Sequence, residues 1–443
     1  MNQFKDILFK SISGVRISLF RFLFGLVIFW EMGRLVLWDN IIHYQYINTV
    51  FNFKYPNFSW IEIAPDGVMY AIVWSTLIFS LLFAIGVLHR VITPILFLLY
   101  TYLVLIDSSY WNNHYYFYSL ILFLFIFIPP AINGLRGLKL RTINYQWQVY
   151  ILQFMVIVVL FFGGISKLSN AGWIDGSACD ALILNEVNRK GIEMSSSWHD
   201  ISSFLMTWGG LFFDLTAGFL LLYRRTFWWI LPVFILFNLS NSYVFSIGSF
   251  PFAMLGTLAL FLPKSIYQRL KFENQTEEKL ITPLNRKLTL MCLGVFISIQ
   301  LLLPFRHFLI KGNVFWTGEG KLYAWHMMSG AVSLHADNFY VVAKAPNSEN
   351  KELINVELAK YLNKNQIRNL SKFPNSAPQF ARFIEYEMTI DGYTEIEVYS
   401  EIFVGRNGKL LKPIVDPNQN LLEVETSYWS HNNWILLYLD EGF

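Results

Sequence analysis

Charged residues are scarce in this chain. Of its 443 residues only 15% are Asp, Glu, Lys or Arg, whereas soluble domains average about 25%. Hydrophobic residues make up 54% of the chain, and the formal net charge of +3 is too small to indicate binding to nucleic acid. The composition therefore predicts an integral membrane protein whose main partner is the lipid bilayer.

Cysteine is almost absent, since only Cys179 and Cys292 occur. Cys292 lies inside an apolar run, where we expect a small buried side chain. Cys179 lies in a polar segment, so a disulfide between the two would have to join a loop to the middle of the membrane. The cysteines therefore give no guide to the compartment.

Several catalytic motifs are also missing. The sequence has no GxSxG elbow, no HExxH pair and no P-loop. The histidines at 114, 199, 307 and 326 lack the close spacing of metal ligands, so we expect no metal. We find no internal repeat of the kind that many transporters show.

Long apolar runs dominate the first 310 residues or so, each near the length of about 20 residues that spans a bilayer. We place them at residues 17–38, 68–88, 91–106, 115–132, 147–167, 201–222, 227–245, 249–263 and 288–309. The first run holds Arg21, Glu31 and Arg34 and lacks a small-residue cleavage site, so it is not a cleavable signal. The sequence predicts an all-α polytopic bundle of about nine transmembrane helices over residues 1–312.

Lys and Arg cluster on one side of this bundle, which predicts its orientation because such residues favour the cytoplasmic side. They are Lys5, Lys10 and Arg16 at the N-terminus, Arg90, Arg136, Lys139, Arg141, Arg224 and Arg225 in the even-numbered loops, and six more between 264 and 287. Arg189 and Lys190 are exceptions. We expect an inner or plasma membrane protein with a cytoplasmic N-terminus and with residues 313–443 outside.

The C-terminal part, residues 313–443, changes in character. Alternating stretches at 339–342, 383–390 and 394–404 are typical of strands, and Gly392 marks a turn. Asn407 and Gly408 between apolar runs favour a hairpin. We therefore predict a small, mainly β extracytoplasmic domain.

Polar residues interrupt the apolar background in four segments: 107–114, 163–173, 237–250 and 304–316. With the predicted topology, all four lie at the outer end of the bundle. Polar residues scattered at random would have divided between the two sides. Their convergence predicts a functional site at that end.

Lys167 is the most informative single residue. A lysine at the end of a span often extends its amine to the interface, which is the ordinary interpretation. Lys167, however, lies on the predicted outer side, where the positive-inside bias disfavours a lysine. Gly163 and Gly164 also allow close helix packing that would bury the amine. Burial disfavours the charged form of an amine, so Lys167 is a candidate base for a phenol-like substrate.

Other polar residues have ordinary interpretations beside functional ones. His114 follows two asparagines at a helix start and is either an interfacial, locally bonded histidine or a site residue. Arg306 and His307 are either outer interfacial anchors or ligands of a substrate. Asp214 lies deep in the sixth run, where we favour a structural pair with an arginine such as Arg21 or Arg34.

Seven short stretches occur in a fixed order along the chain. They are LFRFLFG at 19–25, WNNH at 111–114, GISKLSNAGW at 164–173, DLTAGFL at 214–220, FSIG at 245–248, PFRHFL at 304–309 and WHMM at 325–328. In these stretches and their order, the sequence resembles the vitamin K-dependent γ-glutamyl carboxylase family, including bacterial members described by their HTTM membrane domain. The resemblance covers about residues 15–330.

This resemblance implies a membrane enzyme that uses reduced vitamin K (menaquinol or phylloquinol), O2 and CO2, with no metal. In that family a lysine base deprotonates the hydroquinone, oxygen addition produces a strong base, a glutamyl γ-carbon is carboxylated and the quinone leaves as its epoxide. Lys167 matches the lysine base and His114 its partner histidine. The implied cofactor-binding residues are Asn113, Asn241, Phe245, Ser246 and Gly248, and Arg306 and His307 fall in the segment associated with glutamate binding.

The chain departs from the vertebrate members, whose lumenal region is much longer and binds a propeptide of the substrate. Only residues 313–443 follow the bundle here. Two alternatives therefore stay open beside carboxylation of a glutamate-containing protein or peptide. One is quinol epoxidation without carboxylation, and the other is a non-enzymatic membrane receptor or transporter.

Overall fold

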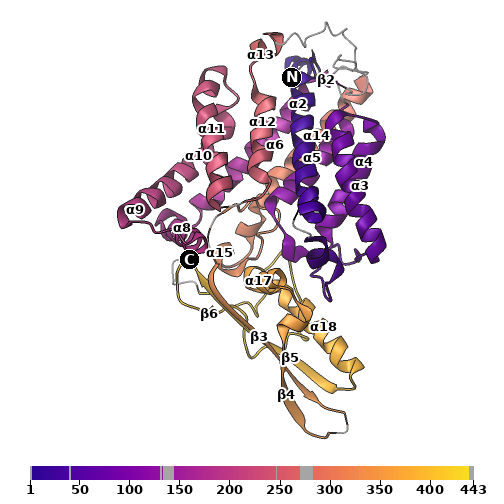
Figure 1. The fold of residues 1–443 in the computed structure, drawn as a ribbon, viewed down its shortest axis with the longest axis vertical. Coiled ribbons are helices and arrows are strands. Elements are labelled where there is room, and N and C mark those ends of the chain that lie inside the picture. Colours follow the sequence, from indigo (N-terminus) through magenta and orange to yellow (C-terminus); the bar gives the residue numbers. More distant parts are fainter. Residues whose placement is uncertain are drawn as a thin grey trace.

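The computed structural model describes residues 2–38, 41–129, 132, 144–245, 247–269, 283–328, 330, 332–346 and 348–438. A helical bundle forms one end of an elongated molecule, and the C-terminal domain forms the other (Figure 1). The N-terminus lies at the far end of the bundle, close to β2 and α13. The N-terminus and the C-terminal domain thus lie at opposite ends of the bundle.

Each predicted apolar run contains a helix. The helices of the bundle are α1 (Asn2–Leu8), α2 (Val15–Gly33), η1 (Arg34–Trp38), η2 (His43–Ile47), α3 (Asp66–Ile85), α4 (His89–Leu105), η3 (Ser108–Tyr110), α5 (Asn113–Phe127), α6 (Gln146–Leu168), α7 (Ala171–Ile174), α8 (Ser177–Lys190), α9 (Ser196–Phe204), η5 (Leu205–Gly209), α10 (Gly210–Leu220), α11 (Arg224–Phe245), α12 (Phe250–Phe261), α13 (Lys264–Arg269), α14 (Pro283–Leu302) and η6 (Leu303–Leu309). A two-stranded ribbon, β1 (Ser11–Ile12) with β2 (Asn144–Tyr145), closes the N-terminal end.

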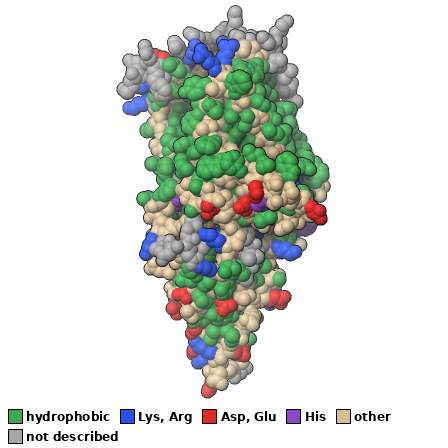
Figure 2. Space-filling model, turned by 90° about the vertical axis from the view of Figure 1, so that its left-hand side faces the viewer, with side chains coloured by type: hydrophobic (Ala, Val, Ile, Leu, Met, Phe, Trp, Pro, Cys, Tyr) green, Lys and Arg blue, Asp and Glu red, His purple; other side chains and the backbone are tan. Residues whose placement is uncertain are grey.

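Five helical segments of the described chain are long and apolar enough to cross a membrane: residues 66–85, 146–168, 196–220, 224–245 and 284–309. The helices α4, α5 and α12 are shorter but also apolar. On the face shown in Figure 2, hydrophobic side chains form a broad band across the bundle, and Lys and Arg side chains lie at the end opposite the C-terminal domain. The predicted helical membrane bundle is confirmed in outline.

Helices α6 and α10 cross at unusually short range because glycines face the crossing point. A Cβ added at Gly164 would lie 2.9 Å from the backbone nitrogen of Leu215, and one added at Gly218 would lie 3.1 Å from the Cα of Ile157. The prediction that Gly164 permits close helix packing is therefore confirmed. This crossing sets the distance between the side chains that α6 and α10 direct at one another.

The C-terminal domain contains a four-stranded antiparallel sheet in the order β4-β3-β5-β6. Its elements are α15 (Val314–Thr317), β3 (Val332–Lys344), β4 (Lys351–Val356), α16 (Leu358–Tyr361), α17 (Lys364–Lys372), η7 (Pro374–Ser376), α18 (Ala377–Ile390), β5 (Thr394–Arg406) and β6 (Lys412–Pro413). Phe380 and Ile384 of α18 pack with Val341 and Ile402 of the sheet to form a core separate from that of the bundle. The predicted β domain is thus a sheet that helices cover.

Two local predictions in this domain have different outcomes. Asn407 and Gly408 have φ angles of 50° and 78° and lie between β5 and β6, so the hairpin is confirmed. The strand predicted at 383–390 is wrong, because this stretch is the second half of α18. Residues 377, 380, 381 and 384 are buried, and this spacing is the period of a helix and not of a strand.

The C-terminal domain is attached to the bundle by amide side chains. Gln379 of α18 accepts a hydrogen bond from the backbone nitrogen of Lys54 at 2.8 Å and donates to its carbonyl at 3.2 Å. Gln366 of α17 donates to the carbonyl of Phe51 and to the Asp107 carboxylate. Residues 51–55 and 107–110 therefore hold the domain against the end of α4 and the start of α5.

Both cysteines are free. Cys179 is buried in α8, whereas Cys292 is exposed on α14. The expected burial of Cys292 is wrong because α14 lies at the edge of the bundle with most of its side chains facing outward. The prediction that the two cysteines do not pair is confirmed.

Candidate functional site

Lys167 and Asp214 form a buried ion pair at the crossing of α6 and α10. The Lys167 Nζ lies 2.6 Å from Asp214 Oδ2, and each residue is only 4% exposed. Gly163 lies one turn before Lys167, and a Cβ added there would lie 3.5 Å from Asp214 Oδ2. The same Cβ would lie only 3.0 Å from the Cε of Met327, so the glycine leaves room chiefly for the Met327 side chain.

This pair corrects the prediction for Asp214. We expected it to pair with an arginine such as Arg21 or Arg34, but its partner is Lys167. Arg21 instead donates to the carbonyls of Ala84 and Ile132 near the opposite end of the bundle. Lys167 is likewise not an isolated amine, because a carboxylate lies within hydrogen-bonding distance.

The Lys167 Nζ has two further neighbours. It donates a hydrogen bond of 3.0 Å to the carbonyl of Met327, and it lies 4.9 Å from the centre of the Trp173 ring. Trp173 is itself buried and fixed by a hydrogen bond from its Nε1 to the carbonyl of Thr207. The amine is thus held by a carboxylate, a carbonyl and an aromatic face.

The carbonyl of Met327 belongs to a connector, residues 318–328, which lies between α15 and β3. Three of its non-glycine residues, Tyr323, Trp325 and Met328, have φ angles of 63°, 57° and 46°. Such left-handed conformations cost energy for side chains of this size and are often associated with functional sites.

This backbone conformation directs three carbonyls of the connector at three different helices of the bundle. Asn113 Nδ2 of α5 donates to the carbonyl of His326 at 2.9 Å, and Arg306 Nη2 of η6 donates to that of Leu322 at 3.0 Å. Lys167 of α6 donates to the carbonyl of Met327, as described above. The connector therefore brings together Asn113, Lys167 and Arg306, which the sequence predicted as site residues.

Several buried polar atoms around the connector have no hydrogen-bond partner among the described residues. They are Nδ1 and Nε2 of His326, Nε2 of His307, Oδ1 of Asn113, Nε1 of Trp325 and Nε of Arg306. Buried polar atoms in folded proteins are nearly always bonded. Their concentration in one place is what a site for a polar ligand requires.

The two histidines of this group face each other. The His307 and His326 rings are 4.6 Å apart and almost perpendicular, and Nδ1 of His307 lies 2.8 Å from the carbonyl oxygen of Pro304. His326 is 5% exposed, and burial lowers its pKa well below the usual value, with His307, Lys321 and Lys167 lowering it further. His326 is therefore neutral at physiological pH, so one of its ring nitrogens donates a hydrogen bond and the other accepts one.

His114 lies in the first turn of α5, beside Asn113, and is buried against aromatic rings. Its ring stacks on Phe250 at 5.9 Å and meets Tyr115 at 4.3 Å. Within the described contacts it does not touch Lys167 directly. The two residues are linked through the connector, because Asn113 bonds to His326 and Lys167 bonds to the next residue.

The segment around residue 245 lies partly beside His114. Gly248 has a φ of 73°, and a Cβ added there would lie 3.5 Å from an Arg34 guanidinium nitrogen. Asn241 and Phe245 are half-buried in the last turns of α11, and no described contact joins them to Lys167 or His114. Ser246 lies outside the described residues.

Two residues of the site were not predicted as functional. Asp214 could have been paired with Lys167 from the sequence, because both are single charges in neighbouring apolar runs, where each is costly alone. His326 lies in the WHMM stretch, yet only the structure shows that its ring is buried beside His307 and Lys167.

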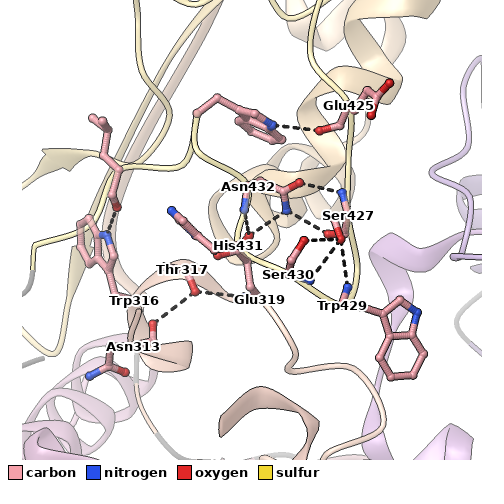
Figure 3. A network of polar contacts seen from close by, with 12 residues as sticks. Asn313, Trp316, Thr317, Glu319, Glu425, Ser427, Trp429, Ser430, His431 and Asn432 are labelled. Atoms are coloured by element: carbon pink, nitrogen blue, oxygen red, sulfur yellow. Dashed lines mark hydrogen bonds and ion pairs between the residues drawn. The ribbon is translucent and has the colours of Figure 1, made fainter. Parts of the chain in front are cut away.

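A polar network covers the outer side of the connector (Figure 3). The Glu319 carboxylate is 3% exposed and accepts hydrogen bonds from the backbone nitrogen of Asn432 at 2.9 Å and from its Nδ2 at 2.7 Å. His431 Nδ1 lies 2.7 Å from the same carboxylate, and the Arg306 guanidinium lies 5.3 Å from the Trp429 ring. The C-terminal segment 427–434 is thus fixed onto the connector.

Comparison with known proteins divides the chain into two consecutive regions. The family model of the HTTM domain matches residues 9–265, which is more than half of the chain. The model of the vitamin K-dependent gamma-carboxylase lumenal domain matches residues 285–441. No solved structure matches this chain.

Proposed function

The chain belongs to the vitamin K-dependent gamma-carboxylase family, and on this premise we propose that it is a membrane enzyme that oxidises a vitamin K-type quinol with O2 and uses the reaction to carboxylate glutamyl residues with CO2. The observation that carries the proposal is the buried Lys167–Asp214 pair beside a connector rich in unpartnered polar atoms. A receptor or a scaffold does not require a base in such a place.

The residues around Lys167 fit a quinol, which is an aromatic molecule with a polar oxygen at each end. Trp173 supplies an aromatic face beside Lys167, and Phe250 and Tyr115 supply aromatic surface beside His114. His326 and Asn113 supply buried atoms that can bond to oxygen. When bound, the reduced vitamin supplies an acidic hydroxyl and, with O2, the strong base that the carboxylation needs.

Lys167 would accept the hydroxyl proton in its uncharged form. The Asp214 carboxylate at 2.6 Å can take a proton from the Lys167 ammonium, which leaves a neutral amine and a neutral carboxyl group. The pair has no net charge before or after this transfer, so burial opposes the exchange far less than it would oppose discharging a lone group. Asp214 thereby prepares Lys167 to act as the base.

The connector would keep the amine in position and water away from it. The carbonyl of Met327 fixes the direction of Nζ, and the Trp173 ring covers one side. Exclusion of water strengthens electrostatic interactions in the site and protects a reactive oxygenated group. We propose His114, Asn113, Asn241, Phe245, Ser246 and Gly248 as residues of the quinol pocket.

Arg306 and His307 would hold the carboxylate of the glutamyl acceptor. Both have an unpartnered buried nitrogen, and both lie on η6 at the base of the connector. A guanidinium suits a carboxylate because it offers several donors in one plane. His307 lies against His326, so an acceptor bound there would be close to the quinol site.

We also propose the orientation and the domain division that the sequence suggests. The N-terminus and the loops rich in Lys and Arg would be cytoplasmic, and residues 313–443 would form the extracytoplasmic domain after a membrane domain of residues 1–312. The position of the C-terminal domain at the end opposite the N-terminus supports this arrangement (Figure 1).

The test is an epoxide assay with purified protein in detergent, reduced vitamin K and O2. We expect epoxide from the wild type, none from Lys167→Ala, and a wild-type rate from the control Lys311→Ala, whose side chain is exposed at the same end of the bundle. Equal rates in wild type and Lys167→Ala, or no epoxide from any variant, would overturn the proposal. Labelled CO2 with a glutamyl peptide separates carboxylation from epoxidation alone.

A further inference from the structure

A buried arginine lies where the connector meets the C-terminal domain. Arg406 ends β5 and is 6% exposed. Its Nη2 donates hydrogen bonds of 2.9 Å to the carbonyl of Trp316 and to that of Ser371. Its Nε is buried without a partner. The guanidinium therefore joins two segments but retains an unused donor.

Two lysines lie beside this arginine. Lys321 is on the connector, and Lys372 ends α17, directly after Ser371. The two segments touch, since a Cβ added at Gly318 would collide with the carbonyl of Lys372. Gly318 has a φ of 72°, so a glycine is favoured there for two reasons. The contact brings three cations from three different elements together.

The electrostatic state of this group is unusual. Burial lowers the pKa of Lys321 to about 7, with Arg406 and Lys372 lowering it further. Burial lowers the pKa of Lys372 to about 8, with Arg368 and Arg406 contributing, and burial alone lowers that of Arg406 to about 10. The charged neighbours that shift the two lysines are all cations.

No carboxylate compensates these charges in the part of the chain that the structure describes. None of Lys321, Lys372 and Arg406 forms an ion pair there. Glu319 is the nearest carboxylate to Lys321 in sequence, but its oxygens are bonded to His431 and Asn432 (Figure 3). Arg406 is buried and the two lysines are half-buried. Like charges held together there without a counter-charge destabilise the fold.

We propose that Arg406, Lys321 and Lys372 form a binding site for a small, multiply charged oxyanion. Such an anion would accept from the unused Nε of Arg406 and from the two ammonium groups. Arg and Lys together are the residues that bind carboxylate and phosphate groups in proteins. The ligand carries either carboxylates, as an acidic peptide does, or a phosphate group.

The site is separate from the quinol site but close to it along the chain. Lys321 lies on the same connector as His326 and is one of the cations that lower the pKa of His326. An anion bound at Lys321 would offset part of this positive field. Binding would also hold α17 and β5 to the connector, whose conformation fixes the direction of the carbonyls that bind Lys167 and Asn113.

The test is thermal unfolding of the purified full chain in detergent at pH 7 and constant ionic strength. Inorganic phosphate, malonate and chloride are compared. We expect phosphate or malonate to raise the melting temperature of the wild type with saturation, and chloride to have no such effect. A larger response to malonate identifies a carboxylate ligand, and a larger response to phosphate identifies a phosphate ligand.

The variant Lys321→Gln/Lys372→Gln keeps Arg406, which holds the two backbone segments. Without an anion it should melt no lower than the wild type, because the substitution removes repulsion. Its affinity for the anion, measured by calorimetry, should be at least about tenfold weaker. The control Lys364→Gln, at the exposed start of α17, should bind as the wild type does.

Equal anion affinity in the double variant and the wild type would overturn the proposal, and so would stabilisation by chloride that matches the oxyanions. Neither measurement uses a quinol. A negative result here would therefore leave the epoxide assay of the wild type and Lys167→Ala as a separate test of the proposed function.

Discussion

Lys167 and Asp214 are 47 residues apart in the chain, yet their side chains meet at 2.6 Å in the interior of the bundle. Each charge alone would be costly within an apolar bundle. Glycines at 164 and 218 bring α6 and α10 close enough for the pair to form. The position of the base thus depends on how two helices pack and not on α6 alone.

We expect Asp214→Asn to lower both stability and activity. Removing one partner of a buried ion pair leaves an uncompensated charge and costs about 3–5 kcal/mol. Loss of the proton acceptor next to Lys167 should reduce epoxide formation by about 10²- to 10⁴-fold. Thermal unfolding in detergent and the epoxide assay measure the two effects.

The double variant Lys167→Met/Asp214→Leu separates these effects. Apolar residues of similar size should recover most of the lost stability, because neither charge then remains buried. The double variant should still form no epoxide. Wild-type stability and rate in Asp214→Asn would show that the carboxylate has no part in the site.

Gly164→Ala tests the helix crossing. The new Cβ would lie 2.7 Å from the Leu215 side chain and 2.9 Å from its backbone nitrogen, so α10 must move. Overpacking of this kind costs about 1–3 kcal/mol. We expect a lower melting temperature together with a lower epoxide rate, since Asp214 would move with α10.

Gly294→Ala is the matched control for this substitution. It lies in α14, another long apolar helix, and a Cβ there meets nothing within 4 Å. Alanine favours a helix over glycine by about 1 kcal/mol, so we expect slight stabilisation and an unchanged rate. A fall in stability equal to that of Gly164→Ala would mean that the crossing is not closely packed.

The positions of the helices could be predicted from the sequence because an apolar run of spanning length is a local property of the chain. The same holds for the Asn407–Gly408 hairpin, whose left-handed angles suit these two residues. The stretch 383–390 was wrongly predicted as a strand. Eight residues are too few to distinguish the period of a helix from that of a strand, and the adjacent apolar residues Phe383 and Ile384 do not by themselves identify either period.

The site was only partly predictable. Lys167 stood out because it lies at the outer end of an apolar run, and Asn113 and Arg306 because of the stretches that contain them. The connector could not be predicted, since Tyr323, Trp325 and Met328 adopt left-handed angles that such residues rarely adopt. The partner of Asp214 also depended on which helices cross.

Asp337 provides a test by pH. It lies on β3, both of its carboxylate oxygens are buried without a partner among the described residues, and burial raises its pKa to about 7. The unfolded carboxyl has a pKa near 3.8, so the folded state binds the proton more tightly. Stability from this group is present at low pH and is lost as the pH rises towards 7.

We therefore expect Asp337→Asn to raise the melting temperature at pH 8, where the wild type holds a buried charge. At pH 4 both side chains are neutral, and the difference should shrink to near zero. Melting curves from pH 4 to 8 measure this. A difference that does not vary with pH would mean that the Asp337 carboxyl does not titrate in this range.

Glu319→Gln tests whether the C-terminal segment stabilises the connector. The amide keeps the size of the carboxylate but loses its charge and presents an NH2 group to the donors of Asn432 and His431. Loss of these buried, charge-assisted bonds should cost about 1–3 kcal/mol.

We expect Glu319→Gln to show faster hydrogen exchange in segment 427–434 and in the connector. We also expect a reduced epoxide rate, because the carbonyl of Met327 would be less firmly directed at Lys167. The control Glu425→Gln lies two residues before this segment, has an exposed side chain and should change neither quantity. If exchange increases in segment 427–434 alone while the connector and the rate stay as in the wild type, the segment covers the site without stabilising it.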